Sequence, residues 1–412
     1  MEAAAAQAKI TPARRVAFEI LTLVEAGKGH SDDLLRGVRM EELSEADKHL
    51  TTALVMGVLR WQIALDAVVR RFLERPDQRL AEPVALALRM GAFQLLQMDR
   101  IPAHAALSES VELCRAAGNP HATGMVNAIL RKVAGAQKPK ERVFESTAAF
   151  AERLGHPAWL VARWVEQYGR AAALKICEAD QQEPGRGGLF AAGDEGLPEI
   201  DDGSRLVAEI AAAAMPEGGT RVWDCCAAPG GKTLVLALRA ARAEVLATDV
   251  SAKRLAQMQG RLRRFAYANG VKTAVMDASK LPESAGEFDL ILCDVPCSGT
   301  GTLGRNPEIR LRLVPEELAR QAARQKEVLA AALKRLAPGG RLVYSTCSLE
   351  PEENEAVVAA AGSGLRRVSV EELLGKVPGL MVREGLLTDG ALRTLPGVHP
   401  CDGFYAVVLE RD

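Results

Sequence analysis

Two cysteine-containing segments in the second half of the chain carry the strongest chemical signal. Asp294-Val-Pro-Cys-Ser-Gly-Thr-Gly301 places Asp294 and Cys297 just after a buried apolar run, and Ser345-Thr-Cys-Ser348 places Cys347 after another. A thiolate is a strong nucleophile, and a nearby carboxyl group can stabilise the charge that develops when it attacks. If the two runs are neighbouring strands, both thiols face one pocket.

A glycine turn upstream of these segments predicts a ligand-binding loop. Thr220 to Trp223 are typical of a short buried strand, and Lys232 to Arg239 of a helix, with Pro-Gly-Gly between them. A strand that turns through glycines into a helix leaves backbone N–H groups directed at a ligand, and the missing Cβ permits close approach. The turn alone is equally compatible with an ordinary strand–helix connection.

Two acidic residues follow the next two predicted strands. Asp249 ends the strand Glu244–Asp249, about 20 residues beyond the glycines, where an acidic side chain meets a ribose diol. Asp277 follows the third strand and is suited to a purine or its linker. Each residue has a rival role at a helix N-terminus. The site suits NAD or S-adenosylmethionine, and the absence of G-x-G-x-x-G spacing favours the smaller nucleoside cofactor.

The pair of thiols, one acid and a methyl-donor site together match the chemistry of methylation at C5 of cytosine. Thiolate addition to C6 turns C5 into an enamine carbon that can attack a methyl sulfonium, while a carboxyl group bonds N3. A base must then remove the C5 proton. The sequence leaves open whether Cys297 or Cys347 is the nucleophile. Irregular cysteine spacing argues against zinc, and we expect packing roles for Cys225, Cys226 and Cys293.

The elements that position these residues alternate between strand and helix from about residue 204 onward. Such alternation predicts a parallel, doubly wound α/β sheet with its ligands at the carboxyl ends of the strands. The predicted helices cover 206–214, 251–269 and a long segment from Pro315 to Pro338, and the strands cover 220–223, 244–249, 273–276, 288–293, 341–345 and 404–410.

The first half of the chain has a different sequence pattern. Residues 10 to about 136 show helical periodicity without a convincing strand, which predicts an all-α domain of six or seven helices. Two further helices and a Gly/Pro-rich linker follow, the linker near residues 181–200. We therefore expect an all-α domain over 1–142, a helical linker region over 143–203 and a catalytic domain over 204–412.

Bulk composition sets the remaining limits. The 412 residues are 48% hydrophobic and 25% charged, with a net charge of −1, so any nucleic-acid binding must rely on local basic patches. We find no apolar run of about 18 residues and no secretory leader, which favours a cytoplasmic protein without a membrane span. Eight scattered cysteines suggest free thiols. We expect a monomer.

The helical half resembles the NusB-type RNA-binding domain. The resemblance rests on Val58-Leu-Arg60, Leu88 to Leu96, Ile101-Pro-Ala-His104 and Val126 to Arg131. It implies that this half docks RNA. Basic side chains that then serve as phosphate contacts are Arg14, Arg15, Arg131, Lys132, Lys138, Lys140 and Arg142.

The second half resembles the RNA cytosine-C5 methyltransferases. The motifs are Asp224-x-Cys-Ala-Ala-Pro-Gly-Gly-Lys-Thr233, Asp294-x-Pro-Cys-Ser-Gly-Thr-Gly301, Thr346-Cys-Ser348 and Asp402-Gly-Phe404, in that order. Together with its NusB-like N-terminal half, this makes the chain similar to the bacterial members of the family that modify 16S ribosomal RNA. The resemblance implies a Rossmann-like methyltransferase domain, S-adenosylmethionine as cofactor and 16S ribosomal RNA as partner.

The same resemblance implies a role for each site residue. Cys347 is implied as the nucleophile, Cys297 as the helper in product release, and Asp294 as the partner of N3. The implied cofactor contacts are Cys226, Ala227, Ala228, Pro229, Gly230, Gly231, Lys232, Asp249, Asp277 and Asp294.

Two departures from the family pattern leave the target open. The small RNA-binding segment usual before the catalytic sheet is cut to a short stretch near residues 181–200. The basic turn after the fourth strand reads Arg305-Asn-Pro-Glu-Ile-Arg310, with arginine in place of lysine. Alternatives are methylation of a transfer RNA or another ribosomal RNA, or a non-catalytic RNA-binding or antitermination factor. The turn spacing disfavours a dehydrogenase, and the Thr-Cys-Ser cysteine and NusB-like front disfavour a DNA methyltransferase.

Overall fold

The chain forms two compact units, and one short segment that lies within the sequence of the second unit belongs to the first. A computed structural model describes residues 10–136, 145–185, 187–191, 196–381 and 384–412. One unit contains Met1–Glu183 together with Gly304–Arg312, and the other contains Pro184–Leu303 together with Leu313–Asp412. We call them the helical unit and the sheet unit. The domain boundaries expected after residues 142 and 203 stay predictions.

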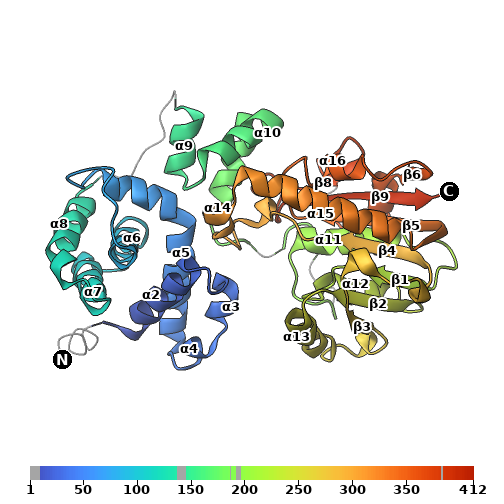
Figure 1. Cartoon of the computed structure of the whole chain (residues 1–412), viewed down its shortest axis with the longest axis horizontal. Helices are drawn as coiled ribbons and strands as arrows, with labels where there is room; N and C mark the ends of the chain where they lie inside the picture. The colour runs from blue at the N-terminus through green and yellow to red at the C-terminus, as the bar shows by residue number, and fades with distance from the viewer. Residues whose placement is uncertain (1–9, 137–144, 186, 192–195, 382–383) are drawn as a thin grey trace. The chain divides into compact units, whose positions relative to one another are not determined.

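The helical unit confirms the all-α prediction for the first half. Its hydrophobic core contains Val58, Leu88 and Val126, three members of the NusB-like segments, each fully buried. Residues 10–136 contain no strand. The helices, coloured blue to green in Figure 1, are α2 (Pro12–Glu25), α3 (Ser31–Leu35), α4 (Val38–Glu41), α5 (Glu45–Arg70), α6 (Glu82–Gln97), α7 (Ala103–Ala116), η1 (Pro120–Ala122), α8 (Thr123–Ala134), α9 (Thr147–Arg153) and α10 (Ala158–Ala179).

Helix α5 is the one described helix long and apolar enough to cross a membrane by length and composition. Half of its most apolar window is buried inside the protein. Its residues Leu54, Val55 and Leu59 are fully buried in the core of the helical unit. Such packing is typical of the central helix of a bundle.

The predicted phosphate contacts of this unit separate into three groups. Arg14 is buried and its guanidinium bonds Gln94 at 2.7 Å and Glu109 at 2.8 Å, so it stabilises the core and cannot reach a phosphate. Arg15, Arg131 and Lys132 are exposed. The remaining three, Lys138, Lys140 and Arg142, lie outside the described residues.

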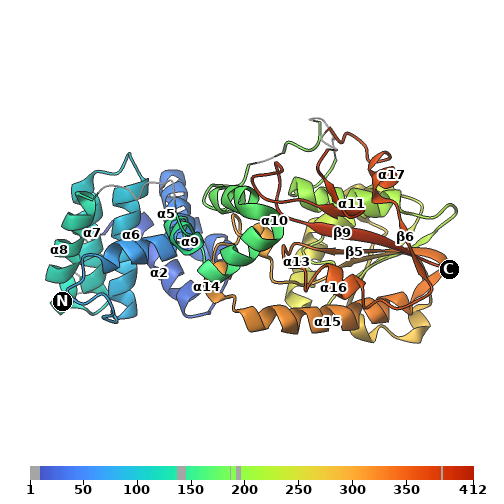
Figure 2. The same cartoon turned by 90° about the horizontal axis from the view of Figure 1, so that it is seen from above.

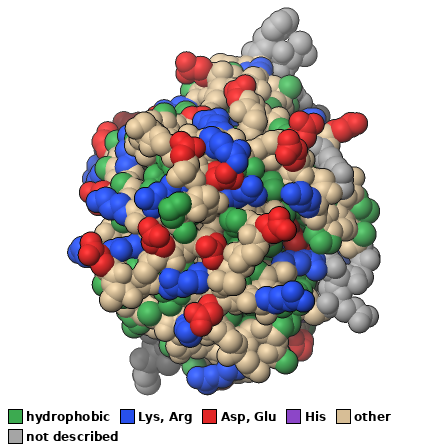
Figure 3. Space-filling model, turned by 90° about the vertical axis from the view of Figure 1, so that its right-hand side faces the viewer, with side chains coloured by type: hydrophobic (Ala, Val, Ile, Leu, Met, Phe, Trp, Pro, Cys, Tyr) green, Lys and Arg blue, Asp and Glu red, His purple; other side chains and the backbone are tan. Residues whose placement is uncertain are grey.

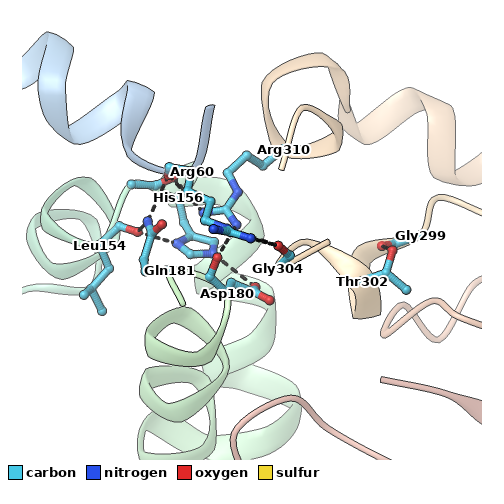
Figure 4. Close-up of polar contacts among 10 residues, drawn as sticks. Arg60, Leu154, His156, Asp180, Gln181, Gly299, Thr302, Gly304 and Arg310 are labelled. Carbon is cyan, nitrogen blue, oxygen red and sulfur yellow. Dashed lines mark hydrogen bonds and ion pairs between the residues drawn. The ribbon is translucent and has the colours of Figure 1, made fainter. Parts of the chain in front are cut away.

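The segment Gly304–Arg312, which ends in α14 (Ile309–Arg312), belongs to the helical unit although it follows the Cys297 motif in sequence. Arg60 of α5 donates two hydrogen bonds to the carbonyl oxygen of Gly304, at 2.8 and 3.1 Å (Figure 4). Glu308 is buried and accepts hydrogen bonds from the backbone and hydroxyl of Ser31, at 2.9–3.0 Å. The segment is therefore bound through its backbone and its side chains.

Arg310 is the most buried basic residue of this segment. Its guanidinium donates to three carbonyl oxygens, those of Arg60, Gly155 and Asp180, at 3.2–3.3 Å. Burial lowers the pKa of Arg310 to about 10, although the charge of Asp180 opposes the shift. The planar guanidinium fork can serve several acceptors at once, which a lysine ammonium does less well.

Replacing Arg310 by alanine is expected to destabilise the helical unit by about 2–4 kcal/mol, because three buried carbonyl groups lose a donor. Arg310→Lys should lose less stability than Arg310→Ala, since the lysine ammonium keeps the positive charge and some of the hydrogen bonds. Urea unfolding followed by circular dichroism measures the difference. The control is Arg36→Ala, which removes an exposed ion pair with Asp32. Equal, small effects of both alanine variants would contradict the role given to Arg310.

The sheet unit contains one mixed sheet of nine strands among the described residues, and it confirms the α/β prediction. The order is β3-β2-β1-β4-β5-β9-β8-β7, with β6 paired to β9. The first five strands of this order are parallel, and β9 is antiparallel to β5. The strands are β1 (Arg221–Asp224), β2 (Glu244–Asp249), β3 (Lys272–Val275), β4 (Phe288–Asp294), β5 (Leu336–Thr346), β6 (Leu365–Val368), β7 (Leu387–Thr388), β8 (Ala391–Arg393) and β9 (Tyr405–Arg411).

Helices cover both faces of this sheet, as Figure 2 shows. One face packs against α11 and α17, whose residues Leu206, Ile210 and Leu373 share a core with β4 and β9. The other packs against α15 and α16 through Val328, Leu329 and Val357. The helices of this unit are α11 (Asp202–Ala213), α12 (Gly231–Arg239), α13 (Ala252–Leu262), η2 (Ala266–Ala268), η3 (Ala278–Lys280), η4 (Glu283–Ala285), η5 (Thr300–Thr302), α15 (Pro315–Leu333), α16 (Glu355–Val358) and α17 (Val370–Leu374).

The register of the sheet places the predicted catalytic residues at one edge, the carboxyl ends of the parallel strands. Asp294, the last residue of β4, pairs with Ser345 of β5, two residues before Cys347. Asp224, the last residue of β1, pairs with Leu292 of β4. Because the chain reverses its winding between β1 and β4, a crevice for a ligand is expected outside their carboxyl ends.

Candidate active site

A cavity of about 260 Å³ lies at this edge of the sheet. It is lined by residues from the loops after all five parallel strands. Eight predicted site residues line it: Cys226, Ala228, Pro229, Asp249, Asp277, Asp294, Cys297 and Cys347. Four others, Ala227, Gly230, Gly231 and Lys232, are not among the described lining residues. The structure therefore gathers both thiols and all three carboxylates around one space.

The turn between β1 and α12 has the tight geometry that its glycines predict. Gly230 has a φ of 91°, and a Cβ there would approach the Met258 side chain to 2.7 Å. The preceding Ala228–Pro229 peptide is cis. The backbone N–H of Ala228 donates to Asp249 at 3.2 Å, which joins the turn to the end of β2. Gly230 thus supports the shape of the turn from behind, while Ala228 and Pro229 face the cavity.

The two acidic residues after β2 and β3 combine a local structural contact with a place in the cavity wall. Asp249 is buried, accepts the backbone N–H of Ser251 at 2.8 Å and lies 3.5 Å from Arg254. Asp277 caps η3 by accepting the N–H and hydroxyl of Ser279. The Ser279 hydroxyl bond is the main reason that the pKa of Asp277 is lowered. Both remain able to accept a ligand hydroxyl, since a carboxylate offers about four acceptor positions.

The two predicted catalytic thiols are in direct contact. The Sγ atoms of Cys297 and Cys347 lie 3.3 Å apart, within hydrogen-bonding distance for sulfur. The backbone N–H of Gly301 also donates to the carbonyl oxygen of Cys347 at 2.9 Å, so the two loops share a backbone hydrogen bond. All eight cysteines of the chain carry free thiols.

The surroundings of the pair favour keeping a proton on Cys297. Its hydrogen bond with Cys347 raises the pKa of Cys297 well above the ordinary value, and burial and the negative charges of Cys347 and Glu353 add to the effect. Lys232 interacts favourably with a negative charge on Cys347. Of the two sulfurs, Cys297 is therefore the one whose surroundings oppose a negative charge, and it lies 3.3 Å from Cys347.

Lys232 forms a buried ion pair that the sequence did not predict. Its ammonium lies 2.8 Å from Asp294 and 5.0 Å from the centre of the Phe404 ring, which belongs to the Asp402-Gly-Phe404 motif. Burial, the largest influence, lowers the pKa of Lys232, but Asp294, Cys347 and Asp224 together outweigh it and the pKa is raised. The other carboxylate oxygen of Asp294 accepts the Ser345 hydroxyl at 2.8 Å.

Asp224, at the end of β1, is a second buried acid beside this pair. It accepts the Thr233 hydroxyl at 2.6 Å. Burial is the main reason that the pKa of Asp224 rises to about 7, with the charge of Asp294 acting in the same direction and the Thr233 bond against it. The folded protein therefore holds a proton on Asp224 over a pH range in which the unfolded chain does not.

The Asp224→Asn variant is expected to become more stable relative to the wild-type protein as pH rises. Between about pH 4, where the unfolded aspartate ionises, and about pH 7, the wild-type protein loses up to about 1.4 kcal/mol per pH unit from this group. Asparagine does not ionise and causes no such loss. The unfolding free energy of the variant minus that of the wild-type protein should therefore grow up to pH 7 and then level off. Urea titrations at several pH values measure it. A difference that is constant with pH would contradict the raised pKa of Asp224.

Comparison with known families agrees with both halves of the chain. Residues 211–410 match the model of the family described as 16S rRNA methyltransferase RsmB/F, and residues 11–135 match the NusB family model. The ribosomal RNA small subunit methyltransferase B of Klebsiella pneumoniae is 33% identical over 93% of this chain and 95% of its own length. The chain belongs to the RsmB/F family of RNA methyltransferases.

A further relative and a solved structure extend the likeness over nearly the whole chain. The probable ribosomal RNA small subunit methyltransferase B of Bacillus subtilis is 29% identical over 98% of this chain and 99% of its own. The solved structure titled PH0851 matches with a TM-score of 0.73 over 98% of this chain and 99% of its own, at 22% identity, which is a likeness of fold. Membership of RsmB/F makes this protein an S-adenosylmethionine-dependent RNA cytosine-C5 methyltransferase.

The residues of this RsmB/F member fit the cofactor of the family. A turn that glycine geometry holds close to the cavity and carboxylates after β2 and β3 are suited to a nucleoside with a charged amino-acid end. Sequence reasoning missed the ion pair of Lys232 with Asp294, and the buried Glu353 behind the two cysteines. The Pro351-Glu-Glu-Asn354 run was the available signal for Glu353, but nothing in its spacing indicates which glutamate turns inward.

Proposed function

We propose that this protein methylates C5 of a cytosine in 16S ribosomal RNA. The proposal goes beyond family membership, since RsmB/F membership establishes the reaction and leaves the RNA open. It is supported by relatives named as small-subunit ribosomal RNA methyltransferases that align over nine-tenths or more of this chain. A ribosomal RNA substrate implies action in the cytoplasm.

The observation that carries the chemistry is the contact between two thiols at the wall of one cavity. A 3.3 Å separation lets one sulfur attack a pyrimidine ring while the other stays within reach of the same ring. The carboxylate of Asp294 lines the same cavity. A dehydrogenase has no use for this arrangement.

The cofactor is assigned to the loops around this cavity. Asp249 is suited to the ribose hydroxyls and Asp277 to the base side of the nucleoside, while Ala228 and Pro229 face the methionine end. S-adenosylmethionine supplies an electrophilic methyl group when bound. Val295, Pro296 and Val328 form an apolar part of the cavity wall.

Cys347 is proposed as the nucleophile that adds to C6. The cation of Lys232 favours negative charge on its sulfur, and the Cys297 sulfur lies 3.3 Å from it. Addition forms a bond between the Cys347 sulfur and C6 and places an electron pair on the enamine carbon C5. To stabilise the negative charge that addition sends to N3, Asp294 must act as a protonated carboxyl group that donates a hydrogen bond to N3, in place of its ion pair with Lys232.

Cys297 is proposed as the base of the release step. Once Cys347 is bonded to C6 it carries no charge, so the main influence that raises the pKa of Cys297 is removed. Cys297 then gives its proton to bulk water and, as a thiolate, accepts the proton from C5. The electron pair of that C–H bond forms the C5–C6 double bond, and the bond from C6 to Cys347 breaks.

RNA docking is assigned to the helical unit. Figure 3 shows one face of the molecule on which Lys and Arg side chains alternate with Asp and Glu, without a large area of one sign. Because the net charge of the chain is only −1, RNA recognition by the helical unit depends on local basic groups, and exposed Arg15, Arg131 and Lys132 belong to its NusB-like region.

Methyl transfer to purified RNA tests this proposal. The protein is incubated with labelled S-adenosylmethionine and unmethylated 16S ribosomal RNA, and bisulfite sequencing then locates the methylated cytosine. We expect label at a single cytosine in 16S RNA and little in 23S RNA or transfer RNA. Label in another RNA, with 16S RNA unmodified, would overturn the target. Absence of transfer to every RNA would overturn the proposed thiol chemistry as well.

A further inference from the structure

Glu353 is a fully buried carboxylate directly behind the two catalytic loops. It lies between β5 and α16, and its side chain has no exposed surface. None of the described Lys, Arg or His side chains forms an ion pair with it. A buried carboxylate of this kind persists only if hydrogen bonds replace its lost hydration.

Those hydrogen bonds come from the residues next to the two cysteines. The Oε1 atom accepts the backbone N–H of Ser298 at 2.8 Å, and Oε2 accepts the Ser298 hydroxyl. Oε2 also accepts the Ser348 hydroxyl. Ser298 follows Cys297 and Ser348 follows Cys347, so one carboxylate binds the neighbour of each thiol.

Further contacts fix Glu353 itself. The amide of Gln325, on α15, donates to Oε1 at 2.9 Å and to the carbonyl oxygen of Pro296 at 2.9 Å. The Tyr344 hydroxyl donates to the Glu353 carbonyl oxygen at 2.6 Å. Because residues of α15 and β5 bind the glutamate from two sides, its position is set by the core of the sheet unit.

We propose that Glu353 is a positioning residue that holds the Cys297 and Cys347 loops together and so sets the contact between the two thiols. The inference rests on the roles proposed above for the two cysteines. The hydroxyls of Ser298 and Ser348 lie 3.0 Å apart on this carboxylate, and the two sulfurs lie 3.3 Å apart. Moving one serine away from Glu353 moves the adjoining thiol.

The charge of Glu353 has a second consequence for the same pair. Among the groups around Cys297, it opposes a negative charge on that sulfur, as Cys347 and burial also do. Lys232, in contrast, interacts favourably with a negative charge on Cys347. The carboxylate thus adds to the electrostatic opposition to a negative charge on Cys297.

Thiol cross-linking tests the positioning role without RNA. The oxidant diamide converts two adjacent thiols into a disulfide, and mass spectrometry of the digested protein measures the Cys297–Cys347 product. We expect Glu353→Ala to slow this cross-link by about tenfold or more, because the thiols lose their fixed proximity. Glu353→Gln keeps the shape and most hydrogen bonds, so it should restore a nearly wild-type rate. Cys297→Ala gives the background.

Kinetics on RNA form the second readout. Glu353→Ala should lower kcat by about 100-fold, as misplacement of a reacting group by about 1 Å does elsewhere, with the KM for S-adenosylmethionine changed less than threefold. Glu353→Gln should recover most of kcat. The control is Glu209→Ala, which removes an equally buried glutamate of α11 that pairs with Arg239 at 2.8 Å.

The outcomes separate the two proposals. Slow cross-linking by Glu353→Ala, rescued by Glu353→Gln, supports the positioning role even if the wild-type protein transfers no methyl group to RNA, in which case the proposed function alone fails. Unchanged cross-linking and kcat in Glu353→Ala, with stability reduced as in Glu209→Ala, would overturn it. If Glu353→Ala does not fold, unchanged rates in the combined Ser298→Ala and Ser348→Ala variant would overturn it instead.

Discussion

Replacing Cys347 by alanine is expected to abolish methyl transfer, with a loss of more than about 10³-fold in kcat, as removal of a covalent nucleophile produces in other enzymes. Without this sulfur, C6 receives no electron pair and C5 does not become nucleophilic. Filter binding of labelled RNA methyl groups measures the loss. Cofactor binding, measured by calorimetry, should change little because Asp249 and Asp277 are untouched.

The matched control for Cys347→Ala is Cys401→Ala. Cys401 is also partly buried in the sheet unit but is not among the described residues that line the cavity. It should retain activity. If Cys347→Ala keeps more than about a tenth of wild-type kcat, sulfur addition at this position is not the first step.

Replacing Cys297 by alanine is expected to trap the reaction after methyl transfer. The Cys347–C6 bond forms as before, but the C5 proton has no base to accept it, so the nucleophile cannot leave. A covalent RNA–protein complex should accumulate and appear as a shifted band on a denaturing gel. Turnover should fall to about one per enzyme, because each molecule stays bonded to its product.

The double variant Cys297→Ala with Cys347→Ala controls for adventitious adducts and should give no shifted band. The order of the two thiols is tested at the same time. An adduct that forms in Cys347→Ala, and not in Cys297→Ala, would show that Cys297 is the nucleophile.

Much of the fold was predictable because its signals are local. Apolar runs such as Phe288–Cys293 and Glu244–Asp249 are short, continuous and separated by helical segments, which is typical of buried parallel strands. The rule that parallel strands end at one edge then brings Cys297 beside Cys347 without any distance information. The short strands β6, β7 and β8 were missed, since two to four partly polar residues give no recognisable alternation.

The missed parts of the site depend on contacts between distant residues. Lys232 was expected at the cofactor, yet its side chain pairs with Asp294, which is 62 positions further along the chain. The inward turn of Glu353 depends on donors from Ser298 and Gln325, on two other elements. Hydrophobic periodicity reports which face of an element is buried, but it does not report which polar groups meet there.

The segment Gly304–Arg312 also limits where the gene of this enzyme can be cut to separate its two units. The chain passes between the helical and sheet units after residue 183, after residue 303 and after residue 312. Cutting the gene once, between the NusB-like region and the methyltransferase region, would leave Glu308 and Arg310 on a fragment without Ser31 and Arg60. Exchange of the helical unit between relatives should therefore succeed only when this nine-residue insert travels with it.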